Sequence, residues 1–331
     1  MVALLLVAAA FVGAEPAWGR PLRDAPAWVD PFWIATLASP WAKVLAFVWG
    51  ALWGSFANVV IYRLPRGMSV VRPRSRCSSC ETPLGALDNI PILSYLLLRG
   101  RCRHCKAPYS ARYVIVEVIC ATLSFALYVR FVAVPLLEGG TGSLAAYGAY
   151  FLFCLTLVVV TYIDLDLWII PDVLVLPVAG VGLVVDALAP EVLGVSLLEG
   201  AASGAVAYLI FAGIRLYYLK FRGIEGLGLG DAKLLVMVGA FTGTWGVLWT
   251  VGAGALQGLL VSVPMLLAGR EVANTALEDV HGDDPTLGEE DPDAGVQGRR
   301  VPFGPFLALA ALEFVLLRDE IAGLVERFLL A

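Results

Sequence analysis

Apolar segments long enough to cross a lipid bilayer recur along this chain, and they limit the possible folds more than any other feature. A membrane-spanning α-helix needs about 20 mostly apolar residues. Hydrophobic residues make up 59% of the 331 residues and charged residues 15%, with a mean hydropathy of +0.81, which is too apolar for a water-soluble domain. The sequence therefore predicts an all-α membrane protein, a polytopic bundle of about eight transmembrane helices.

Polar clusters separate the predicted spans, and one long apolar run needs a turn inside it. The run from Leu234 to Gly269 is too long for a single helix, and the segment Gly243-Thr-Trp-Gly246 is the predicted turn. The predicted spans are 41–62, 113–135, 145–163, 168–188, 201–219, 233–247, 249–268 and 303–317.

Basic residues are concentrated between the first two predicted spans. That loop holds ten Lys and Arg residues but only two acidic ones, Glu81 and Asp88. The positive-inside rule places such a loop in the cytoplasm. Counting spans from there predicts that the loops near Asp164 and Asp231 also face the cytoplasm.

Four regions follow from these patterns. They are an N-terminal extracytoplasmic extension (1–40), a first transmembrane helix (41–65), a small cytoplasmic loop domain with four cysteines (66–112) and a transmembrane domain (113–331). The last contains an acidic loop, 271–298, which is typical of a solvated linker. Residues 1–14 are apolar but short, and a signal peptide, a partial span and a misassigned start codon all remain open.

Two CxxC pairs lie in the basic loop. Their members are Cys77, Cys80, Cys102 and Cys105. Two such turns can supply four thiolates to one tetrahedral zinc ion, a closed site with a structural role. The alternative is two disulfides, which a reducing cytoplasm disfavours. The pattern predicts a zinc-ribbon-like domain, whereas Cys120 and Cys154 lie in apolar segments and are predicted to act as small hydrophobic residues.

Aspartates stand at the predicted cytoplasmic ends of helices. The residues concerned are Asp164, Asp166 and Asp172 in one segment, and Gly228, Gly230, Asp231 and Lys233 in another. Two carboxylates that share one proton can activate water and protonate a leaving amine. Two alternatives remain open: Asp231 caps a helix while Asp164 and Asp166 reach the headgroups, or Asp164 and Asp231 are relay carboxylates of an ion-coupled transporter.

Several segments resemble, in the same order, those of bacterial type IV prepilin peptidases, the GxGD aspartyl peptidases. They are Gly54–Pro65, Pro73–Cys77, Asp88–Ser94, Arg99–Cys102, Arg112–Glu117, Asp164 with Ile170-Pro171, Gly228–Leu234 and Pro302–Pro305. The resemblance covers roughly residues 45–310. It implies an intramembrane aspartyl endopeptidase with Asp164 and Asp231 as its catalytic pair. It also implies supporting roles for Gly228, Gly230, Asp166, Asp172 and Lys233.

The resemblance further implies a substrate, cofactors and a location. The substrate is a membrane-inserted prepilin or pseudopilin precursor whose basic leader meets the cytoplasmic face of the bacterial inner membrane. After cleavage, the new N-terminus is methylated with S-adenosylmethionine, and zinc is structural. The expected partners are the precursor and the lipid bilayer, and no nucleic acid. No residue by itself indicates where S-adenosylmethionine binds.

Overall fold

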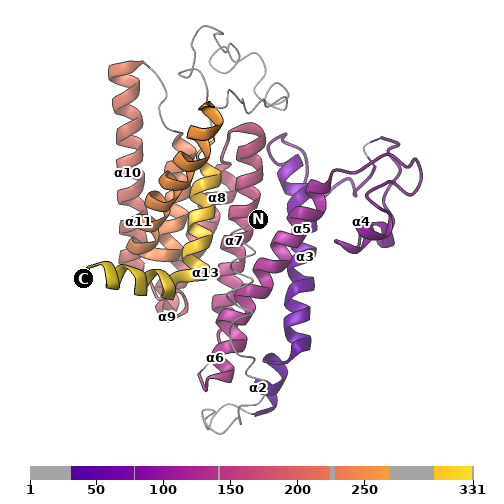
Figure 1. The fold of residues 1–331 in the computed structure, drawn as a ribbon, viewed down its shortest axis with the longest axis horizontal. Coiled ribbons are helices and arrows are strands. Elements are labelled where there is room, and N and C mark those ends of the chain that lie inside the picture. The colour runs from indigo at the N-terminus through magenta and orange to yellow at the C-terminus, as the bar shows by residue number, and fades with distance from the viewer. Residues whose placement is uncertain (1–30, 78, 141, 224–227, 268–301, 330–331) are drawn as a thin grey trace. The chain divides into compact units, whose positions relative to one another are not determined.

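The computed structural model describes residues 31–77, 79–140, 142–223, 228–267 and 302–329 (Figure 1). Helices account for all the regular secondary structure longer than an isolated bridge in these residues, as predicted. The chain forms two compact units. The first consists of residues up to Val59 together with Ser69–Leu155, and the second consists of Val60–Met68 and the residues from Thr156 onward.

Five helices among the described residues are long and apolar enough to cross a membrane. They are Pro40–Arg63, Ala111–Leu137, Leu144–Leu167, Leu197–Arg222 and Leu229–Met265. Each overlaps a span predicted from the sequence, so the prediction of an all-α chain with several membrane spans is confirmed. The described structure supports five candidate spans, however, and not the eight that were predicted.

Short and long helices build the first unit. They are α2 (Pro31–Leu37), α3 (Pro40–Arg63, as far as Val59), α5 (Ala111–Tyr128), the π-helical turn η2 (Val129–Ala133), α6 (Val134–Leu137) and the first part of α7 (Leu144–Leu167). Ile34 of α2 is buried against Tyr128 and Val132, and the Tyr128 hydroxyl donates a hydrogen bond to the Leu37 carbonyl at 2.8 Å. Residues 31–37 of the predicted extension are therefore packed into this unit, while residues 1–30 lie outside the described residues.

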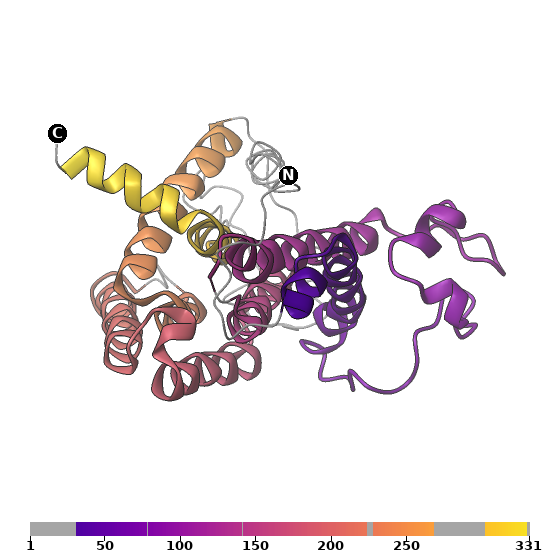
Figure 2. The same ribbon diagram turned by 90° about the horizontal axis from the view of Figure 1, so that it is seen from below.

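The polar loop between α3 and α5 contains two short helical turns, η1 (Ala86–Asn89) and α4 (Leu93–Leu97). Figure 2 shows this loop projecting to one side of α3 and α5. It carries both CxxC pairs and belongs to the same unit as α5.

The second unit is built around α11. Its elements are the second part of α7, α8 (Asp172–Leu188), α9 (Pro190–Leu193), α10 (Leu197–Arg222), α11 (Leu229–Leu267) and α13 (Gly304–Leu329). Helix α11 packs against α8, α10 and α13, and its side chains Leu234, Met237 and Phe241 are fully buried. This central place explains why the first part of α11 is apolar on all sides, whereas its second part exposes large apolar side chains such as Leu256 and Leu260.

Backbone breaks divide two of these helices where the sequence predicted boundaries. Gly243 has φ 64° and ψ −161°, which interrupts α11 and confirms the turn predicted in the run from Leu234 to Gly269. Leu317 (φ −120°, ψ 25°) interrupts α13, and Figure 1 shows the second part of α13 turning away from the first.

The fourth predicted span begins later in the structure than in the prediction. The span predicted for 168–188 starts as a helix only at Asp172, because Pro171 disfavours helical backbone at Ile170 and Trp168 has a left-handed φ of 54°. Residues 168–171, between α7 and α8, therefore form the loop that follows Asp164. The acidic loop 271–298 lies outside the described residues.

Candidate active site and metal centre

Asp164 lies in the last turn of α7 and is buried, with 6% of its surface exposed. Its carboxylate accepts a hydrogen bond from the backbone N–H of Gly304, the first residue of α13. The first N–H groups of a helix have no partner within the helix and favour a negative charge. The start of α13 therefore both stabilises and orients the Asp164 carboxylate.

Asp231 lies in the first turn of α11 and is also buried, with 8% of its surface exposed. Its carboxylate turns back toward Gly228, where an added Cβ would lie 3.2 Å from Oδ2 of Asp231. It also interacts electrostatically with Asp164. This burial does not agree with the alternative in which Asp164 extends to the headgroups while Asp231 only caps its helix.

Ile170 and two glycines pack the elements around Asp164 together. A Cβ added to Gly230 would lie 2.8 Å from Cβ of Ile170. A Cβ added to Gly304 would lie 2.5 Å from Oδ2 of Asp164 and 3.1 Å from Cδ1 of Ile170. The loop before α8, the start of α11 and the start of α13 can therefore meet only because both positions lack a side chain. No role was predicted for Gly304 from the sequence, although it lies in the segment Pro302–Pro305, at the start of the predicted span 303–317.

The predicted supporting residues lie around this pair in different ways. Lys233 and Asp172 form an ion pair, with 2.5 Å between Nζ and Oδ2, that joins the N-terminal part of α11 to the first residue of α8. Asp166 is half-buried, and residues two apart on a helix point to different faces, so Asp166 does not share the face of Asp164. Gly228 lies next to Asp231, and Gly230 lies next to Ile170.

The four loop cysteines come together as one cluster. Their sulfur atoms all lie within 4.8 Å of one another, with 3.8 Å between Cys77 and Cys105 and 3.9 Å between Cys80 and Cys102. Four sulfurs at about 2.3 Å from a tetrahedral zinc ion are about 3.8 Å apart. A disulfide needs about 2.05 Å, and all four thiols are free. The cluster can bind a metal, and its geometry fits zinc rather than two disulfides.

The two CxxC turns are an internal repeat. Residues 76–83 (RCSSCETP) and 101–108 (RCRHCKAP) share the pattern R-C-x-x-C-x-x-P and the same fold, with bridges joining Arg76 to Pro83 and Arg101 to Pro108. In each turn the residue after the second cysteine has a left-handed φ, 54° or 61°, and donates its N–H to the carbonyl of the first cysteine at 3.0 or 3.1 Å. This repeat is visible in the sequence but was not predicted.

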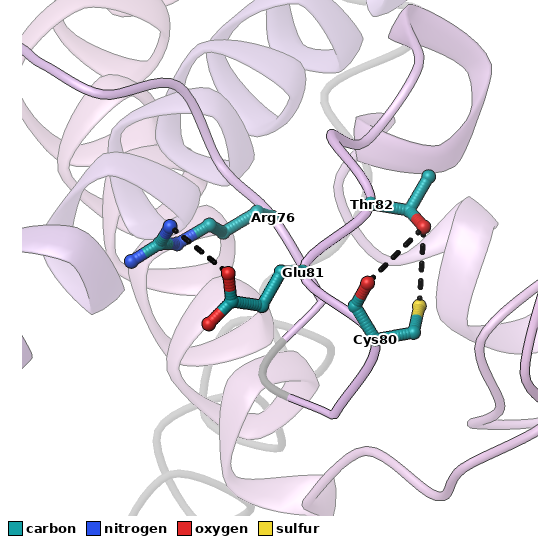
Figure 3. Close-up of polar contacts among 4 residues, drawn as sticks. All are labelled: Arg76, Cys80, Glu81 and Thr82. Atoms are coloured by element: carbon teal, nitrogen blue, oxygen red, sulfur yellow. Dashed lines mark hydrogen bonds and ion pairs between the residues drawn. The ribbon is translucent and has the colours of Figure 1, made fainter.

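Backbone N–H groups in both turns favour thiolates. Hydrogen bonds from the N–H groups of Cys80 and Ser79 lower the pKa of the Cys77 thiol to about 6, and the N–H of Cys105 lowers the pKa of Cys102. Figure 3 shows part of the first turn, where Sγ of Cys80 lies 3.3 Å from the Thr82 hydroxyl. The exposed Arg76–Glu81 ion pair beside it, at 3.8 Å, adds little stability.

Comparison with known proteins matches both halves of the chain. The bacterial peptidase A24 N-terminal domain matches residues 48–131, and the type IV leader peptidase family matches residues 151–263. A prepilin leader peptidase/N-methyltransferase of Aeromonas hydrophila is 34% identical over 85% of this chain and 93% of the relative. A prepilin leader peptidase/N-methyltransferase of Myxococcus xanthus (strain DK1622) is 37% identical over 84% of this chain and 91% of the relative. The chain belongs to the type IV leader peptidase family. No solved structure matches it.

Membership of this family confirms the predicted resemblance and replaces the transporter alternative. The four cysteines fall within the match to the N-terminal domain, and Asp164 and Asp231 fall within the match to the leader peptidase family. Gly304 lies beyond that second match, so its contact with Asp164 comes from the structure alone.

Zinc content tests the role of the cysteine cluster. We expect purified protein to contain about one zinc ion per chain and Cys102→Ser to lose most of it, because three thiolates leave a tetrahedral site incomplete. Metal analysis of both proteins measures this, and Cys154→Ser, which changes a thiol buried in α7, is the matched control that should keep its zinc. Wild-type protein without zinc would contradict the prediction.

Proposed function

We propose that Asp164 and Asp231 are the catalytic aspartates of a prepilin leader peptidase/N-methyltransferase. The observation that carries the proposal is the burial of two interacting carboxylates within the segment that matches a peptidase family. Burying a carboxylate among apolar helices costs free energy, and such residues by default mark a functional site. Relatives with this name align with most of the chain, which supports the same activity here.

The chemistry follows from two carboxylates that share one proton. The ionised carboxylate takes a proton from water as that water attacks the scissile carbonyl carbon, and the protonated one donates a hydrogen bond to the carbonyl oxygen. When the C–N bond breaks, a proton passes to the leaving amine and the pair returns to its starting state. The N–H of Gly304 keeps one oxygen of Asp164 fixed during these transfers.

The site belongs, in this proposal, at the cytoplasmic face of the bacterial inner membrane. Ten basic residues between the first two spans support this orientation, since it puts them in the cytoplasm. Helix α8, the first part of α13 and the division of α11 at Gly243 would extend the five candidate spans to eight.

The proposed substrate is a prepilin or pseudopilin precursor that is held in the bilayer and has a basic leader. S-adenosylmethionine supplies the methyl group for the new N-terminus, and no described residue is assigned to bind it. A four-thiolate zinc site has no open position for a catalytic water, so the cysteine cluster has a structural role. Loss of zinc is therefore expected to affect methylation more than cleavage, because Asp164 and Asp231 lie on other helices.

The proposed function is tested with purified enzyme in lipid vesicles, a prepilin or pseudopilin precursor and isotope-labelled S-adenosylmethionine. Mass spectrometry of the product should show loss of the leader and gain of one labelled methyl group. Enzyme that retains its fold and its zinc but releases no leader from any such precursor would contradict the proposal.

The ion pair between Asp172 and Lys233 is expected to support the site without doing chemistry. Because both side chains are partly exposed, Lys233→Gln should lower the cleavage rate only about fivefold or less. Cleavage rates of Lys233→Gln, Asp172→Asn and the double variant measure the coupling between the two residues. If the free-energy costs of the two single variants add up to the cost of the double variant, the pair does not act as a unit.

A further inference from the structure

The segment between the two cysteine turns exposes an unusual number of large apolar side chains. Within residues 86–98, which include η1 and α4, the exposed ones are Leu87 (73%), Ile90 (37%), Leu93 (47%), Leu96 (63%) and Leu97 (72%). Contiguous apolar surface on a soluble loop marks a place where something else binds. Elsewhere in the described part of this loop the exposed large apolar side chains are Met68 and Val71, and the other residues are mostly charged or polar, so residues 86–98 hold most of this surface.

A partly buried hydrogen bond fixes this segment against the body of α5. The backbone N–H of Ile92 donates a hydrogen bond to a carboxylate oxygen of Glu117 at 2.7 Å, and the Ser55 hydroxyl of α3 donates to the same carboxylate. Glu117 follows Ala111, the first residue of α5, by six positions, which is about 9 Å along the helix axis. The segment is therefore held well inside the end of a membrane-spanning helix.

The figures agree with this placement within the first unit. Figure 1 shows α4 level with the body of α5, and Figure 2, seen from below, shows it to the side of that helix and not over its end. Ile92 has a left-handed φ of 63°, which is rare for a β-branched residue and requires the surrounding contacts to hold it. The hydrogen bond to Glu117 is such a contact.

We propose that residues 86–98 lie in the membrane interface, with the leucines of α4 among the acyl chains of the leaflet that α5 enters. Interfacial helices insert about 5–10 Å below the headgroup boundary. The distance from Ala111 to Glu117 along the axis of α5, about 9 Å, is of the same size. Arg99 and Arg101 follow α4 directly and are exposed, and they are positioned to contact lipid phosphates. The cysteine cluster is thereby tied to the bilayer and not suspended freely in water.

Lipid fits this surface better than a protein partner does. The apolar side chains Tyr113, Ile115 and Val118 of α5 are also exposed, and a membrane-spanning helix presents such residues to acyl chains. The apolar surface of α4 continues at the same level as this lipid-facing helix. Basic residues at its edge match anionic headgroups.

Photo-crosslinking in vesicles of phosphatidylethanolamine and phosphatidylglycerol tests the proposal. The full chain carries p-benzoylphenylalanine in place of Leu97, and mass spectrometry after irradiation detects phospholipid adducts. We expect a yield similar to that from the same probe in place of Leu209, which is 66% exposed on the spanning helix α10. A yield no higher than in the unirradiated sample, or adducts only with a second copy or with added precursor, would overturn the proposal.

Variants of Glu117 test whether its hydrogen bond with Ile92 holds residues 86–98 in the membrane interface. Glu117→Gln keeps an oxygen that can accept the Ile92 N–H, and it should keep the lipid adducts at position 97. Glu117→Ala removes the acceptor and should lower them severalfold, while adducts at position 209 stay unchanged. Equal yields at position 97 in the two variants would show that Glu117 does not hold the segment in the membrane.

Discussion

Asp231→Asn and Asp164→Asn are each expected to lower the turnover of leader cleavage by about 10²–10⁴-fold, the usual contribution of a general acid or base. An amide cannot accept or release the shared proton, so each change removes one half of the pair. Both side chains are buried and near one another, and Asn has almost the same shape as Asp, so the helices should pack as before. Initial rates of leader release from a purified precursor measure the effect.

Asp166→Asn is the matched control for this prediction. Asp166 lies on the same last turn of α7 as Asp164 but points to a different face, so its loss should cost far less activity. Membrane insertion and thermal unfolding of all three variants should resemble wild type. Near wild-type cleavage by Asp164→Asn or by Asp231→Asn would remove that residue from the catalytic pair.

Hydropathy predicted an all-α chain with several membrane spans, because crossing a bilayer imposes a length and composition that any sequence must show. The break at Gly243 was predictable for the same reason, since no single helix spans so long an apolar run. The packing of α11 against α8, α10 and α13 was not predictable, because apolar side chains that face lipid and those that face protein look alike in the sequence. The short helix α2 was too brief to carry a periodic signal.

Some residues of the candidate site could be predicted from the sequence and others could not. Asp164, Asp231 and the four cysteines were predictable because ionisable or thiol side chains stand out in their surroundings and have recognisable spacing. The contact of Gly304 with Asp164 was hidden, because a glycine has no side chain chemistry and the two residues are far apart in the chain. Ile170 was part of a segment that resembled the family, but nothing in the sequence indicated that it packs against Gly230 and Gly304.

Gly304→Ala is expected to lower cleavage by about 10²-fold or more, because catalysis is sensitive to displacements of about 1 Å. A Cβ at this position would lie 2.5 Å from Oδ2 of Asp164, on the carboxylate that the backbone N–H of Gly304 holds. Either the carboxylate or the start of α13 must move, and both movements disturb the pair with Asp231. Cleavage rates at saturating precursor separate this loss of turnover from weaker substrate binding.

Gly180→Ala in α8 is the matched control, since a Cβ added there meets no atom within 4 Å. Alanine is the better helix former by about 1 kcal/mol, so this variant should be at least as stable as wild type and fully active. Thermal unfolding and zinc content of Gly304→Ala should stay close to those of Gly180→Ala, because the crowding is local to Asp164. If Gly304→Ala cleaves precursor as fast as Gly180→Ala does, the start of α13 does not position Asp164 for catalysis.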